Sequence, residues 1–76
     1  MMQMFERLVL TQDIPGTILK AGDVGTIVEI YANGAAYEVE FFALDGSTIA
    51  VETISAEFAC AASGNQILHV RELEIG

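Results

Sequence analysis

The sequence has few of the residues that small proteins use for cross-linking or for export. It contains a single cysteine, Cys60, among 76 residues, so an internal disulfide is excluded. Secreted domains of this size are usually held together by disulfides, which makes the cytoplasm the expected location. No cationic leader precedes a long apolar stretch at the start of the sequence, so we also predict no secretory signal.

Basic residues and long apolar runs are equally scarce. Three Lys and Arg stand against eleven Asp and Glu, which gives a formal net charge of −8 and an isoelectric point near 4.1. Such a chain repels nucleic acids and anionic lipid surfaces. No apolar run approaches the roughly 18 residues needed to span a bilayer. We therefore expect neither a nucleic-acid partner nor a membrane partner.

Residues that could carry catalysis or hold a metal are sparse. No loop has the dense Asp and Asn ligands of a calcium site, and no Cys/His quartet suggests zinc. Cys60 and His69 are the only conceivable nucleophile and base, but the apolar neighbours of Cys60 do not activate a thiol. We interpret Cys60 as a core or interface residue and His69 as a half-exposed strand residue, and we predict no enzyme and no cofactor.

The sequence is rich in residues that form turns and in runs of β-branched residues, above all between positions 20 and 42. Asn33-Gly34 favours a two-residue hairpin turn, because both positions tolerate positive φ. The run 24–31 has apolar groups on both faces, which is typical of a strand covered on both sides. Gly25 inside that run indicates a bulge or a close approach to the backbone.

The clearest alternation lies in residues 36–42. Tyr37, Val39 and Phe41 share the predicted core face, whereas Glu38 and Glu40 point to water. Together with Glu29, these two glutamates predict a solvated acidic face that could attract divalent cations without enclosing them.

Five short strands are predicted in all, separated by tight turns. In the first, Leu8 and Leu10 share one face. Residues 56–62 are compatible with a helical turn, a loop or an irregular strand. Residues 71–73 predict a short 3₁₀ turn that places Leu73 and Ile75 over one end of the domain. The expected strands are 5–10, 24–31, 36–42, 48–54 and 66–70, and turns are expected at 14–16, 21–23, 45–46 and 63–65.

The fold that buries these strands most economically is all-β. We predict a single domain over residues 1–76, a five-stranded, partly open SH3-like barrel with a short 3₁₀ or helical turn near the C-terminus. An OB-fold is the main alternative, but it usually carries a helix between its third and fourth strands, where this chain has only the Asp45-Gly46 turn.

Several segments together resemble a known family. They are Asp13-Ile14-Pro15, residues 19–29, Ala36 to Phe41 and Asp45 to Val51. Between Leu8 and about Glu57 the chain resembles DUF4926, a bacterial family of unknown function that is frequent in cyanobacteria. The resemblance implies a small, stand-alone β-barrel protein and brings no catalytic residues. The C-terminal part departs from the family pattern, with residues 58–66 inserted before Val70.

Hydrophobic residues make up 53% of the chain and the mean hydropathy is +0.48, which is high for a short acidic domain. Some apolar surface is therefore expected to meet a partner, either a second copy or an unidentified protein. We predict a non-catalytic interaction or assembly module. A small ligand-binding protein or enzyme that uses Cys60, His69 or the acidic face is the alternative. Candidate contact residues are Tyr31, Phe42, Phe58 and Leu68.

Overall fold

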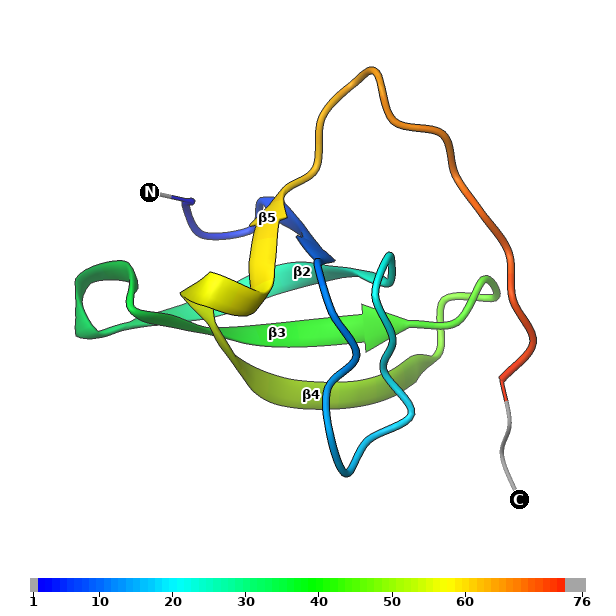
Figure 1. Cartoon of the computed structure of the whole chain (residues 1–76), viewed down its shortest axis with the longest axis horizontal. Helices are drawn as coiled ribbons and strands as arrows, with labels where there is room; N and C mark the ends of the chain where they lie inside the picture. The colour runs from blue at the N-terminus through cyan, green and yellow to red at the C-terminus, as the bar shows by residue number, and fades with distance from the viewer. Residues whose placement is uncertain (1, 74–76) are drawn as a thin grey trace.

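The computed structural model describes residues 2–73, which form one antiparallel sheet of five strands (Figure 1). The strand order is β4-β3-β2-β1-β5, so the last strand lies beside the first. Two 3₁₀ turns, η1 and η2, are the only helical elements in this part of the chain. The all-β prediction is confirmed. The elements are β1 Arg7–Leu10, β2 Val24–Tyr31, η1 Ala32–Gly34, β3 Ala36–Phe42, β4 Thr48–Ser55, η2 Ala56–Phe58 and β5 Ala59–Ala61.

The core lies on the inner face of this curved sheet. Alternate residues of β3 are buried, as the sequence predicts, because a strand turns successive side chains to opposite faces. Leu19 lies in the long loop between β1 and β2 and is buried in this core. Phe58 of η2 is partly buried and packs against the core. The eight core side chains are Leu8, Leu10, Leu19, Ile27, Tyr37, Val39, Phe41 and Ile54.

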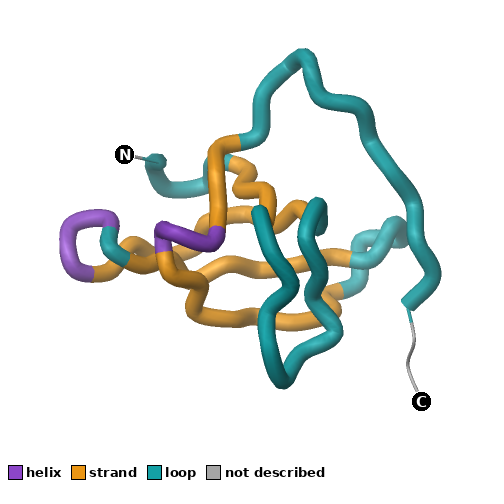
Figure 2. Tube along the Cα trace, viewed as in Figure 1, coloured by secondary structure: helices purple, strands orange, loops and turns teal. Residues whose placement is uncertain are grey.

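The loop of residues 11–23 folds back on itself as two adjacent arms (Figure 2). The backbone N–H of Leu10 donates to the Asp23 carbonyl at 2.9 Å, and that of Gly22 donates to the Leu10 carbonyl at 2.8 Å. At its tip Gly16 adopts φ 77°, which the turn after Pro15 requires. The turns predicted here are confirmed, and they hold Leu19 over the core.

The predicted two-residue turn between β2 and β3 is wrong. Tyr31 pairs with Ala36, which leaves a four-residue loop. Asn33 and Gly34 have the expected positive φ of 57° and 97°, but Ala32 also has a positive φ of 49°. The Ala35 N–H donates to the carbonyls of Tyr31 and Ala32, at 3.1 and 3.3 Å, and thereby closes a 3₁₀ turn instead of a tight hairpin.

At Gly25 two side chains of β3 lie close to the backbone of β2. The bulge of β2 lies elsewhere, between Ile27 and Glu29. A Cβ atom on Gly25 would lie 2.9 Å from the Phe41 ring. Only one face of β2 reaches the core, so the prediction of a strand covered on both sides is wrong. Val24 is 40% exposed because it belongs to the opposite face of the sheet.

The first and last strands differ from those expected. β1 begins at Arg7 rather than Phe5, because Phe5 has φ 66° and cannot continue a strand. Residues 59–61, rather than 66–70, pair with β1, because η2 delivers the chain directly to that free edge. Ala59 and Ala61 lie opposite Leu10 and Leu8. The strand predicted at residues 66–70 is therefore wrong.

After β5 the chain runs as an extended arc outside the sheet (Figure 1). We call residues 62–73 the tail. It has the predicted turn at Gly64-Asn65 and no regular structure after it. The 3₁₀ turn predicted at residues 71–73 is therefore wrong, and Ile75 lies outside the described residues.

Candidate functional site

The outer face of the sheet, turned away from the core, carries the predicted acidic residues. Glu29 of β2 lies directly opposite Glu38 of β3. The Thr53 hydroxyl donates to Oε1 of Glu38 at 2.7 Å, and the Thr48 hydroxyl donates to Oε2 of Glu40 at 2.6 Å. These bonds offset part of the repulsion that like charges on paired strands create. The carboxylates thus form an ordered row on the surface.

Among residues 2–73 the structure brings together no group of three or more His, Cys, Asp or Glu side chains that could hold a metal ion. No helix in that range has the length and apolar character needed to cross a membrane.

An open groove of about 950 Å³ lies between the tail and the end of the sheet. Its sheet wall includes Val9, Val24 and Phe42 of the outer face, and its tail wall includes residues 67–70. Phe42 is 43% exposed although it is a large aromatic residue. Both walls are mostly apolar, so the groove offers hydrophobic contact rather than polar chemistry.

An ion pair ties the far end of the tail to the body of the domain. Nε and Nη2 of Arg71 donate to the two carboxylate oxygens of Asp23, at 2.9 and 2.6 Å, and Nη2 also donates to the Ile18 carbonyl at 2.8 Å. The two side chains are partly buried. A guanidinium fork on a carboxylate fixes orientation as well as distance, so this contact sets the path of the tail.

The pKa of Asp23 lies below its ordinary value of 3.8. Partial burial pushes this pKa upward, but the hydrogen bond from Arg71 and the bond from the Lys20 backbone N–H outweigh it. The nearby positive charges of both residues act in the same direction. The carboxylate form of Asp23 is therefore favoured in the folded chain.

This lowered pKa predicts an acid-dependent contribution to stability. Because the folded pKa of Asp23 lies below the unfolded one, its contribution is present above the unfolded value and is lost as the pH falls through the folded value. Urea melts of the wild type and of Asp23→Asn should differ at neutral pH and converge below pH 3.8. Glu72→Gln in the exposed tail is the control. A difference that stays constant down to low pH would contradict the ion pair.

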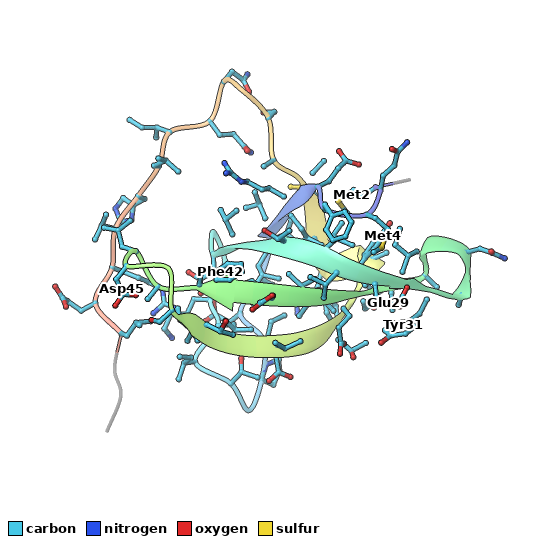
Figure 3. All side chains as sticks on the ribbon, turned by 180° about the vertical axis from the view of Figure 1, so that it is seen from behind. Met2, Met4, Glu29, Tyr31, Phe42 and Asp45 are labelled. Carbon is cyan, nitrogen blue, oxygen red and sulfur yellow. The ribbon has the colours of Figure 1, made fainter. Side chains whose placement is uncertain are left out.

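The four candidate contact residues do not form one surface. Tyr31 and Phe42 lie at opposite ends of the sheet (Figure 3), and Phe58 is half-buried in η2 against the core. Phe42 and Leu68 do line the same groove. Leu44, which is 94% exposed and lines the groove with them, is a contact residue that the sequence did not predict. An apolar residue in a turn gives no sequence signal of its exposure.

Cys60 is exposed, so of its two predicted roles the core residue is wrong, and the interface residue stays a prediction. Cys60 pairs with Val9, and its neighbour Ala59 is the β5 residue that is partly buried against the core. His69 is also exposed and lies in the tail rather than in a strand. The structure thus places Cys60 in β5 and His69 in the tail.

The chain matches the model of a family described as a domain of unknown function, DUF4926, over residues 4–58. The match spans β1 to η2 and stops before β5 and the tail. No curated protein and no solved structure gives a significant match. Since the family model covers well over half of the 76 residues, the chain belongs to the DUF4926 family.

Proposed function

We propose that this protein is a non-catalytic interaction or assembly module whose first partner is a second copy of itself. The observation that carries the proposal is the amount of apolar surface left in water. Among the described residues, eleven large hydrophobic side chains are exposed, against eight that form the core. Isolated exposed residues are ordinary, but several of these gather around one groove. Contact with another chain would remove them from water.

The topology supports the finer assignment to an SH3-like, partly open barrel. A long loop separates the first two strands, and a 3₁₀ turn precedes a last strand that pairs with the first. Domains with this architecture commonly bind other chains through surface aromatics and loops, which is support by analogy of fold. We also propose that the protein is bacterial, from a family frequent in cyanobacteria, and that it is located in the cytoplasm.

Sedimentation equilibrium over a wide concentration range tests this function. We expect the average mass to rise above the monomer value of 8.2 kDa between micromolar and millimolar chain concentration. Added salt should strengthen the association, because it screens repulsion between chains of net charge −8. A chain that remains monomeric throughout, with or without salt, would overturn self-association.

A further inference from the structure

We propose that residues 66–70 of the tail form the contact between two copies, pairing antiparallel with the same residues of the second copy so that Leu68 faces Leu68. This inference rests on the self-association proposed above and names its surface. Four features of the tail support it: exposed apolar side chains, backbone groups without hydrogen bonds, a lack of charged residues, and the attachment of Arg71 to Asp23.

The apolar side chains of this segment are almost entirely in water. Ile67 is 93% exposed, Leu68 89% and Val70 71%. No neighbouring element of the described chain covers them, although each is a residue that folded proteins usually bury. Three such residues within four positions, with only His69 between them, concentrate apolar surface in one place, whereas exposed apolar residues that are scattered singly are ordinary.

The backbone of this segment also makes few hydrogen bonds with the described part of the chain. Gln66 donates its N–H to the Ser63 carbonyl at 3.2 Å, but residues 67–70 take part in no backbone hydrogen bond with any described residue. Their composition suits a strand, since Ile and Val are β-branched and proline is absent. An exposed, extended segment with free N–H and C=O groups is a template for pairing with another strand.

The distribution of charge favours a second copy at this place. Residues 58–70 contain no Asp, Glu, Lys or Arg, in a chain whose net charge is −8. On the outer face of the sheet two copies would bring the row of Glu29, Glu38 and Glu40 together. Two copies that meet through residues 66–70 of the tail bring no carboxylates face to face. The repulsion between the copies is therefore smallest where the apolar residues are most exposed.

The anchoring of the tail sets the register. Arg71 is held by Asp23, so the pairing segment ends at Val70. Antiparallel pairing of residues 66–70 with themselves places Leu68 at the centre and Val70 opposite Gln66. This contact is a two-fold, self-complementary one that closes at the dimer. Because Arg71 fixes one end of the segment in advance, less conformational freedom is lost when two copies meet.

Cysteine cross-linking tests the register. In a Cys60→Ser background, Leu68→Cys should form a disulfide-linked dimer rapidly under mild oxidation. Paired antiparallel strands place facing Cα atoms about 4.5–5.5 Å apart, within the roughly 4.4–6.8 Å range of disulfides. Phe5→Cys in the same background is the control, because Phe5 is 72% exposed but lies outside both the segment and the groove. Equal cross-linking rates at positions 5 and 68 would overturn the proposed pairing.

A charge variant separates this inference from the proposed function. Leu68→Glu places two carboxylates at the centre of the contact and should weaken dimerisation by at least about tenfold in sedimentation equilibrium. Phe5→Glu adds the same charge at an exposed apolar residue outside the segment and the groove, and it should change dimerisation little. If Leu68→Glu dimerises like the wild type, the tail pairing is overturned and self-association stands. If the wild type itself is monomeric, both fail.

Discussion

Replacement of Phe41 by alanine should severely weaken the protein and remove a large part of its stability. The Phe41 ring is among the largest fully buried side chains of the core. Its truncation removes the ring from the inner face of β3 and leaves a cavity, at a cost of about 3–5 kcal/mol. A domain of this length has a total stability of roughly 4 to 11 kcal/mol. Urea melts followed by circular dichroism measure the loss.

The matched control for Phe41 lies on the other face of the same strand. Glu38→Gln keeps an oxygen that can accept the hydrogen bond from Thr53 and removes one charge from the pair with Glu29. Its midpoint should remain within the ordinary range of surface substitutions, about 0.5 kcal/mol. If Glu38→Gln were the more damaging of the two, the register of β3 would be shifted by one residue.

Substitution of Gly25 by alanine should also be strongly destabilising. Gly25 is paired with Leu8 on one side and Phe41 on the other. Its added methyl would lie 2.9 Å from two atoms of the Phe41 ring and closer still to Val39 Cγ1. Because both neighbours belong to the packed core, relief requires them to shift, at a cost of about 1–3 kcal/mol.

Gly64→Ala provides the control for this substitution. Nothing lies within 4 Å of a Cβ at Gly64, which also does not adopt the left-handed φ of Gly16, Gly22, Gly34 and Gly46. Alanine there should be neutral, or stabilising by less than about 1 kcal/mol, through the lower entropy of the unfolded chain. Thermal melts of the two variants give the comparison. Equal midpoints would contradict the close packing of β2 on β3.

The sequence predicts those strands in which polar and apolar side chains alternate, or in which several β-branched residues follow one another. The bounds of β2 and β3 are those expected, because Asn33-Gly34 marks the break between them and glutamates mark the wet face of β3. The predicted end of β4 at Ile54 differs from the observed one by a single residue. These signals are local, so no knowledge of the tertiary fold is needed to interpret them.

The last strand and the site depend on contacts between distant residues. Residues 66–70 have the better strand composition, yet Ala59–Ala61 takes the edge of β1, because η2 brings it there first and small side chains fit beside Leu8 and Leu10. The Arg71–Asp23 ion pair joins positions 48 residues apart. No local pattern marks such a pair, so the groove and the path of the tail could not be predicted.

Amide hydrogen exchange as a function of chain concentration tests the central claim most directly. In the dilute monomer the amides of residues 67–70 should exchange without protection, since they donate to no described residue. At concentrations where sedimentation shows a dimer, amides of this segment should become protected, while those of β3 stay protected throughout. A dimer in which the amides of residues 67–70 remain unprotected would contradict the account.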